Sequence, residues 1–387
     1  MAIIVPLAAF HAEENYTLTH ESRKAPVIST VTDQKTLTDY LQDRLGFRPA
    51  LVRVYSVLRY YGVNNPALTE HWFDKQLPRA GKIVHQNQVG EDSGVFVAHN
   101  GWLFNFANLA LGGFSFTRKN IENNIKAEQR TRDYYAAKGA VYFAMIVPHK
   151  ANIYPEFLDA KLDPATRETP ADKMLAALED NGVHTINPKQ TLLANKDQQI
   201  WQVYDTHWTQ RATYLAYQDI LKIFNQTGVL QNEQPVSVTF TQNLTKDCNL
   251  SGYLDLSLQE TIPIAQFERS SVETTEGALY DALRVVFAED QKLPPHRINE
   301  SLFNEMHLFE NPTAQGGTLM LWTDSMGIVG RGLPGFLAEH FKRVLVIDRR
   351  PPIDPKIDDI LQPDVVIYSN VESSVAEQSL LKASWLP

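Results

Sequence analysis

The sequence predicts an α/β protein built on a doubly wound, mainly parallel sheet. Apolar runs at 140–148, 317–322, 343–347 and 363–369 are almost uninterrupted, as expected of strands that are buried on both faces. A helix-like segment at 335–341 separates the second run from the third. Strand, helix and strand at such short spacing indicate parallel pairing through a right-handed crossover. We therefore expect reacting groups at the carboxyl ends of the strands.

The elements ahead of the first long strand are indicated by periodicity and by turn residues. Apolar residues recur at spacings of three or four between 36 and 61, which predicts helices. The segment 93–106 predicts a hairpin, because two short apolar strands flank Asn100–Gly101, a preferred dipeptide for a tight turn. A polar helix is predicted over 120–138, and Gly139 ends it.

Three more elements lie between the first long strand and the middle of the chain. They are a helix at 170–181, a short strand at 184–188 and an amphipathic helix at 209–224.

The chain divides into two predicted parts. Residues 1–84 form an N-terminal arm and helical extension, and residues 85–387 form the catalytic domain. Within that domain, 229–310 is predicted to be a β-rich insertion or cap, with β-like pieces at 236–240 and 283–287.

Composition excludes some classes of function. The chain has 387 residues and a formal net charge of -9, and nucleic-acid binding would need a basic footprint instead. Cys248 is the only cysteine, which excludes an intramolecular disulfide and a cysteine-based zinc site. The histidines show no metal-like spacing, and we expect neither a metal nor a cofactor. The apolar residues 1–10 fit either the stub of a membrane anchor or a leading strand.

The stretch "LMLWTDSMG" at 319–327 carries the strongest local signal for chemistry. An apolar strand runs directly into Asp324 and Ser325 and then into a glycine and a helix. A serine at such a turn is exposed at the edge of the sheet, where the following N–H groups can stabilise an oxyanion. The alternative is a helix cap formed by Asp324 or Ser325.

The stretch "YDTHW" at 204–208 supplies an acid and a base two positions apart. Asp205 can accept a hydrogen bond from the Nδ1–H of His207, which leaves Nε2 free to take a hydroxyl proton. Two other interpretations stay open: Asp205 as a helix N-cap with His207 packed in the core, or an Asp-x-His metal site. Trp208 fits a structural role at the helix start or a wall that stacks on a sugar.

A serine turn after a parallel strand, with an Asp-His pair before another helix, resembles the SGNH-type hydrolases. The pair precedes the serine here, and that order resembles the alginate O-acetyltransferase family (AlgJ and AlgX), whose SGNH-like domain is circularly permuted. Seven blocks are similar to that family's and stand in the same order. They are 21–26, 43–48, 100–104, 147–156, 205–208, 251–256 and 363–372.

The resemblance implies a role for each matched site residue. Ser325 would be the nucleophile, His207 the general base, and Asp205 the group that orients the base. This chain has Thr323 and Met326 where such serine blocks carry a glycine and an aromatic residue, so the N–H of Ser325 itself is the expected oxyanion donor.

Four residues are expected to bind the substrate. Two basic residues follow the strand at 343–347, and two aromatic residues lie in or beside the family blocks. They are Arg349, Arg350, Tyr154 and Trp208.

The function implied by the resemblance is O-acetylation of a bacterial exopolysaccharide through a serine acyl-enzyme. The implied location is periplasmic or extracytoplasmic, with an N-terminal anchor to the inner membrane. The implied partners are a membrane-bound O-acyltransferase that donates acetyl, the polysaccharide, and other exopolysaccharide synthesis and secretion proteins. The chain ends soon after the last predicted strand, so we expect no C-terminal carbohydrate-binding module. Two alternatives are a carbohydrate acetylesterase with the same triad and a non-catalytic scaffold that binds polysaccharide.

Overall fold

The computed structural model describes most of the chain after residue 95. The described residues are Thr32, Gln34, 83–85, 95–105, 118–158, 169–245, 248–254, 256–292, 305–348 and 354–372. The helices predicted over 36–61, most of the N-terminal arm, and Arg349 and Arg350 lie outside the described residues. The division of the chain at residue 85 stays a prediction.

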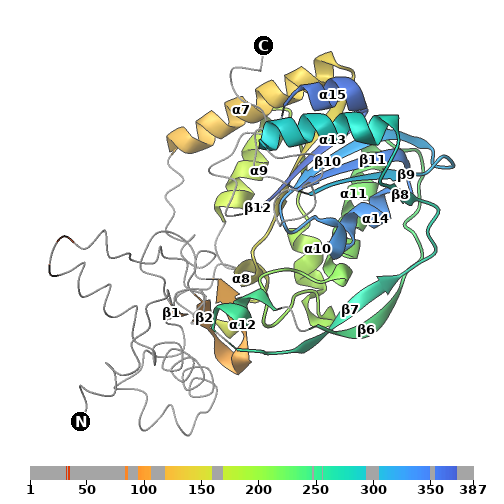
Figure 1. Ribbon diagram of the computed structural model, residues 1–387. Helices are drawn as coiled ribbons and strands as arrows, with labels where there is room; N and C mark the ends of the chain where they lie inside the picture. Colours follow the sequence, from red (N-terminus) through yellow and green to blue (C-terminus); the bar gives the residue numbers. More distant parts are fainter. Residues whose placement is uncertain are drawn as a thin grey trace, which may run out of the picture.

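A seven-stranded sheet forms the centre of the fold (Figure 1). From edge to edge its strands are β5 (His184–Ile186), β4 (Val141–Val147), β12 (Val365–Val371), β10 (Gly316–Thr323), β11 (Phe341–Asp348), β9 (Glu305–Glu310) and β8 (Val272–Thr274). Neighbours from β5 to β11 pair in parallel, and β9 and β8 extend the sheet by antiparallel pairing. The predicted mainly parallel sheet is confirmed.

Helices cover both faces of this sheet, as the doubly wound prediction requires (Figure 1). One face, called here the α11 face, is covered by α8 (Lys150–Ile153), α10 (Lys189–Ala194), α11 (Gln210–Thr227) and α14 (Leu333–Leu337). The other, called the α7 face, is covered by α7 (Arg118–Ala137), α9 (Pro170–Asp180), α13 (Ala278–Gln291) and α15 (Lys356–Leu361).

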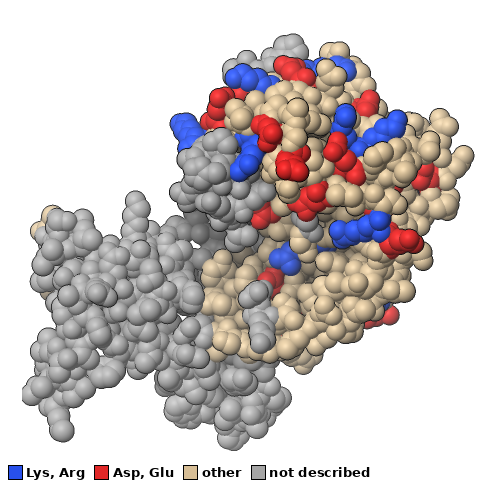
Figure 2. All heavy atoms as spheres, turned by 45° about the vertical axis from the view of Figure 1, so that its right-hand side comes forward, with Lys and Arg blue, Asp and Glu red and all other residues tan. Residues whose placement is uncertain are grey.

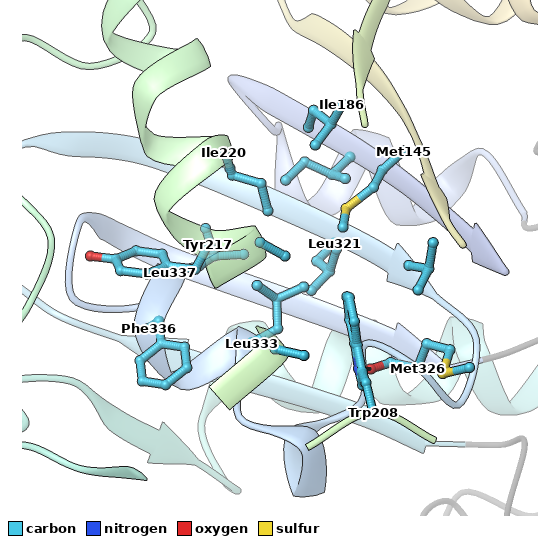
Figure 3. Close-up of a cluster of buried hydrophobic side chains, with 14 of the residues drawn as sticks. Met145, Ile186, Trp208, Tyr217, Ile220, Leu321, Met326, Leu333, Phe336 and Leu337 are labelled. Carbon is cyan, nitrogen blue, oxygen red and sulfur yellow. Dashed lines mark hydrogen bonds between the residues drawn. The ribbon is translucent and has the colours of Figure 1, made fainter. Parts of the chain in front are cut away.

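Alternation along the strands divides the core between these two faces. In β10, Leu319 and Leu321 pack on the α11 face, while Met320 and Trp322 pack on the α7 face. Both sets are fully buried, which explains why the strand sequences are apolar throughout. Burying one such side chain contributes about 1.5–3 kcal/mol. Figure 3 shows part of the α11-face core, with Leu321 among side chains from α11 and α14.

The helix ends follow from local chemistry. α9 begins with a capping box between Thr169 and Asp172. α7 stops shortly before Gly139, whose φ of +82° suits a residue without a side chain. α11 ends in the same way at Gly228, with a φ of +77°.

Two small sheets lie outside the central one. The first contains β1 (Ile83–His85), β2 (Val95–Val97) and β3 (Leu103–Asn105), with the turn η4 (His99–Gly101) between the last two. Its turn residues Asn100 and Gly101 both have positive φ, which confirms the predicted hairpin. The second pairs β6 (Thr239–Thr245) with β7 (Glu260–Gln266), and the short helix α12 (Asn249–Tyr253) lies between these strands in the sequence. Short 3-10 turns complete the described elements: η5 (Pro155–Phe157), η7 (Lys196–Gln198) and η9 (Val329–Arg331).

Three predictions differ from the structure. Residues 283–287 lie in the helix α13, because a short apolar run does not by itself distinguish a strand from a buried helix. Residues 229–310 are not one separate cap, since β8 and β9 complete the central sheet and only β6 and β7 form a sheet of their own. The helix expected at 335–341 starts earlier and ends at Leu337, because β11 begins at Phe341.

Figure 2 shows acidic and basic side chains interspersed among the described residues of this face. Within the described ranges, every helix is too short or too polar to cross a membrane.

Candidate active site

The side chains of Asp205, His207 and Ser325 form a continuous hydrogen-bonded line. The Nδ1 of His207 lies 2.6 Å from Oδ1 of Asp205, and its Nε2 lies 2.9 Å from Oγ of Ser325. An ionised carboxylate only accepts hydrogen bonds, so Nδ1 carries the proton and Nε2 is left as the acceptor for the serine hydroxyl. The structure thus brings together the three residues that the sequence predicted as a triad.

Ser325 stands at the point where the order of strands in the sheet reverses. β10 lies between β11 and β12, and the chain passes from β10 to β11 over the α11 face. It then crosses over the α7 face, by way of α15, to reach β12 on the other side of β10. Such a reversal leaves open space at the carboxyl ends of the strands, where ligands bind in open α/β sheets.

The turn that carries Ser325 is held by its neighbour Asp324. Oδ1 of Asp324 accepts the N–H of Met326 at 2.9 Å, and Oδ2 accepts the N–H of Val371 at 2.6 Å. The first bond closes an Asx turn, and the second ties this turn to the end of β12. The predicted alternative was a helix cap, but the next described elements, η9 and α14, begin only at Val329 and Leu333. Asp324 closes a turn instead, and the hydroxyl of Ser325 meets His207.

The loop that carries Asp205 keeps its carboxylate charged. The side chain is 2% exposed, so burial alone would raise its pKa. Hydrogen bonds from the ring of His207 and from the N–H of Asn249 lower the pKa of Asp205 to about 2. The interpretation of Asp205 as a helix cap is wrong, because Thr209 occupies the N-cap position of α11.

Asn249 is a second anchor of this loop that sequence reasoning missed. Its N–H donates to Oδ2 of Asp205 at 2.8 Å, and its side-chain oxygen accepts the N–H of Thr206 at 2.9 Å. The one signal in the sequence was the family-like block at 251–256, which the structure places in and after the same short helix, α12.

Trp208 joins the acid–base loop to the serine turn. The indole is fully buried, and its Nε1–H donates to the carbonyl of Met326 at 2.6 Å. Figure 3 shows the two residues side by side at the edge of the α11-face core. The structural role is confirmed, and the prediction that Trp208 stacks on a sugar is wrong because its ring has no free face.

Tyr154 also lies in the interior. It is 4% exposed, its hydroxyl donates to the carbonyl of Lys196 at 2.6 Å, and its ring packs 4.6 Å from that of Trp102. The prediction of Tyr154 as a cleft residue that touches substrate does not fit this placement.

Two groups near the triad can donate further hydrogen bonds, namely the backbone N–H of Ser325 and the guanidinium of Arg331. Among the described residues, nothing accepts a hydrogen bond from the backbone N–H of Ser325. Arg331, at the end of η9, has a buried Nε without a hydrogen-bond partner. Burial lowers the pKa of Arg331, and the charge of Asp205 opposes this. No motif in the sequence marked this arginine.

The part of the chain that the structure describes contains no group of three His, Cys, Asp or Glu side chains suited to a metal ion. Asp205 and His207 are instead occupied with each other and with Ser325.

Comparison with known proteins identifies the family of this chain. Residues 95–293, which include Asp205 and His207, match the family described as the SGNH hydrolase-like domain of the acetyltransferase AlgX. The chain belongs to this family. No curated protein sequence matches it.

Solved structures show the same fold at low identity. The structure of Bacillus cereus PatB1 with a sulfonyl adduct matches with a TM-score of 0.56 and 16% identity. The match covers 76% of this chain and 99% of the PatB1 chain. The O-acetyltransferase domain of Pseudomonas putida AlgJ matches with a TM-score of 0.50 and 16% identity. This match covers 76% of this chain and 98% of the AlgJ chain. The fold is therefore that of an SGNH hydrolase-like domain, as predicted.

Proposed function

We propose that this protein is an O-acetyltransferase that acts on hydroxyl groups of a bacterial exopolysaccharide through a serine acyl-enzyme. The observation that carries the proposal is the line of Asp205, His207 and Ser325, joined by contacts of 2.6 and 2.9 Å at the carboxyl end of β10. Membership of the acetyltransferase family supports acyl transfer rather than another serine chemistry.

In the first half of the reaction, Oγ of Ser325 attacks the carbonyl carbon of the acetyl donor while Nε2 of His207 takes the hydroxyl proton. The oxyanion that forms accepts a hydrogen bond from the N–H of Ser325. His207 then returns the proton to the leaving oxygen of the donor, and acetyl-Ser325 remains. Asp205 stabilises the imidazolium without taking its proton, because its own pKa is about 2.

In the second half, a sugar hydroxyl gives its proton to Nε2 of His207 and attacks acetyl-Ser325. The tetrahedral intermediate collapses, the acetyl ester of the sugar leaves, and the proton returns to Oγ of Ser325. The same base thus serves both halves of a ping-pong cycle.

The acceptor and the partners extend this proposal beyond the site. The similar P. putida AlgJ domain is named an O-acetyltransferase, and we propose an alginate-like polysaccharide as the acceptor here. We propose a periplasmic location, an N-terminal anchor to the inner membrane, and a membrane-bound O-acyltransferase as the source of acetyl groups. Other exopolysaccharide synthesis and secretion proteins complete the proposed set of partners.

Arg331 is the residue that we propose to hold an oxygen of the substrate. A guanidinium presents donors suited to a carboxylate or a developing oxyanion, and the buried Nε of Arg331 has no protein partner. Arg349 and Arg350 stay candidates for binding an anionic sugar.

The test is turnover of p-nitrophenyl acetate with and without an acceptor oligosaccharide, followed by mass spectrometry of the protein. We expect acetylated Ser325 to accumulate without acceptor, acetylated sugar to form with it, and Ser325→Ala to lose both. Acetate release at the same rate with and without oligosaccharide would indicate the esterase instead. Unchanged turnover by Ser325→Ala would remove the serine from the mechanism.

A further inference from the structure

A buried lysine lies behind the acid–base loop and takes no part in the mechanism above. Lys150 is 1% exposed, although a lone buried ammonium is costly. Its Nζ donates to the carbonyls of Leu103 at 2.7 Å, Val203 at 2.8 Å and Asp205 at 3.2 Å. An ammonium has three donors and no acceptor, so these three carbonyls use all of them.

Glu260 holds the same loop through its N–H groups. One carboxylate oxygen accepts the N–H of Val203 at 2.7 Å, and the other accepts the N–H of Tyr204 at 2.9 Å. The thiol of Cys248 lies 3.7 Å from the second oxygen. Lys150 and Glu260 therefore bind the carbonyl and N–H groups of the residues that lead into Asp205.

Their positions in the fold explain how the two charges reach one loop. Lys150 begins α8, just beyond the carboxyl end of β4, and Glu260 begins β7 of the separate two-stranded sheet. The loop with Asp205 runs between them. Lys150 also joins it to β3 through the carbonyl of Leu103.

Stability alone does not account for this pair. Burial lowers the pKa of Lys150 and raises that of Glu260, and each charge opposes the shift of the other. Burying each of these two charges is costly, because each ion must lose its water. What this pair achieves is geometric, since five charge-assisted hydrogen bonds hold the backbone around the catalytic loop.

We propose that Lys150 and Glu260 are positioning residues that hold the loop of residues 203–205 so that Asp205 meets His207, and His207 meets Ser325, at hydrogen-bond distance. The inference rests on the proposed function. Neither residue touches the reacting atoms, and both act through the backbone of the loop. They also belong to the set of charges around the Asp205–His207 pair, together with Arg331 and Asp324.

The first test replaces Lys150 by methionine, which has a similar length and no charge. We expect kcat for p-nitrophenyl acetate to fall about 100-fold with little change in KM, because a displacement of about 1 Å at the base has that effect. The acidic limb of the pH–rate profile should move to higher pH, because losing a positive charge near the pair favours the protonated imidazole.

The matched control is Lys189→Met. Lys189 is also buried, and its Nζ donates to Oδ2 of Asp172 at 2.6 Å rather than to the loop that carries Asp205. It should lose stability without a change in kcat or in the pH–rate profile. An equal change in both variants would mean that Lys150 acts only through stability.

Glu260→Gln and the double variant Lys150→Met/Glu260→Gln separate positioning from charge burial. The amide introduced by Glu260→Gln keeps one acceptor oxygen, so we expect a folded protein with kcat about 10-fold lower. The double variant has no unpaired buried ion, so its Tm should rise above that of Lys150→Met while kcat stays low. Recovery of kcat together with Tm would overturn the proposal, as would wild-type kcat in folded Glu260→Gln. If the proposed function itself is wrong, the wild type will show no turnover that depends on Ser325. This outcome is distinct from a failure of the positioning proposal alone.

Discussion

Two buried carboxyl groups, Asp205 in the loop before α11 and Glu128 on α7, favour different charge states. Asp205 and Glu128 are both almost inaccessible, at 2% and 8% exposure. Burial raises the pKa of Glu128 to about 7, and the hydrogen bond from the hydroxyl of Tyr142, at 2.5 Å, opposes this only in part. For Asp205, the imidazole and two backbone N–H groups outweigh burial and lower the pKa to about 2. The hydrogen-bond donors around a buried acid, rather than the degree of its burial, decide whether it stays ionised.

The two charge states reflect different surroundings on the two sides of the sheet. The α7 face buries acids against tyrosines, and burial likewise raises the pKa of Asp358, which accepts from Tyr134 and Tyr135, to about 7. Hydrogen bonds from tyrosine hydroxyls are enough for a buried carboxyl that is uncharged. The proposed mechanism needs an anion at Asp205, and N–H donors keep this buried carboxylate ionised.

The largest expected effect comes from the same chemical change at these two sites. Asp205→Asn should lower kcat about 10,000-fold, because an amide can present its NH2 group to His207 and stabilise the wrong tautomer. Glu128→Gln should keep wild-type kcat. Both variants are compared by p-nitrophenyl acetate hydrolysis at the same pH, and similar kcat values for the two would contradict the contrast between these sites.

Arg331→Met is expected to lower kcat/KM about 100-fold, the effect of losing one donor to the substrate or oxyanion. Arg211→Met is the matched control, because Nε of Arg211 is also buried without a partner but its guanidinium stacks on Phe240, 4.5 Å away. Steady-state kinetics are measured on both variants to test whether Arg331 contacts the substrate or the oxyanion. If the two lose activity equally, the free donors of Arg331 have no special role.

Trp208→Phe removes the donor to the carbonyl of Met326 and should lower kcat about 10-fold. It should also reduce the free energy of unfolding by about 1–3 kcal/mol, since a buried carbonyl is left unpaired. Trp322→Phe, at an equally buried indole on the α7 face, should lose stability but keep kcat. Chemical denaturation and kinetics are measured on both, and unchanged kcat in Trp208→Phe would contradict the link between loop and turn.

The smallest effect is the pH dependence of stability at Glu128. Its pKa is raised in the folded state, so the proton is held between about pH 4.5 and 7 where the unfolded chain releases it. Stability therefore falls as pH rises through that window, and the loss is complete above it. Glu128→Gln should raise Tm at about pH 8.5 and leave it nearly unchanged at about pH 5. Equal shifts at both pH values would show that Glu128 is not held neutral.

Much of the fold was predictable because it depends on local patterns. The buried strands β4, β10, β11 and β12 are continuous apolar runs, and their alternate residues fill the two halves of the core. The three triad residues were also named in advance from two short motifs. Residues 283–287 were misassigned because an apolar run of that length fits a strand and a buried helix equally. The circular permutation and the roles of Arg349 and Arg350 stay predictions.

The sequence by itself determined the layered α/β class, the identity of the three residues proposed as nucleophile, base and acid, and their order along the chain. Only the tertiary structure decided what holds them together. Lys150 reaches the carbonyl of Asp205 across 55 positions, and Trp208 reaches that of Met326 across 118. Backbone acceptors have no residue identity, so contacts to them leave no pattern in the sequence. The same reason turned Tyr154 and Trp208 from expected sugar contacts into buried supports, because burial depends on neighbours that are distant along the chain.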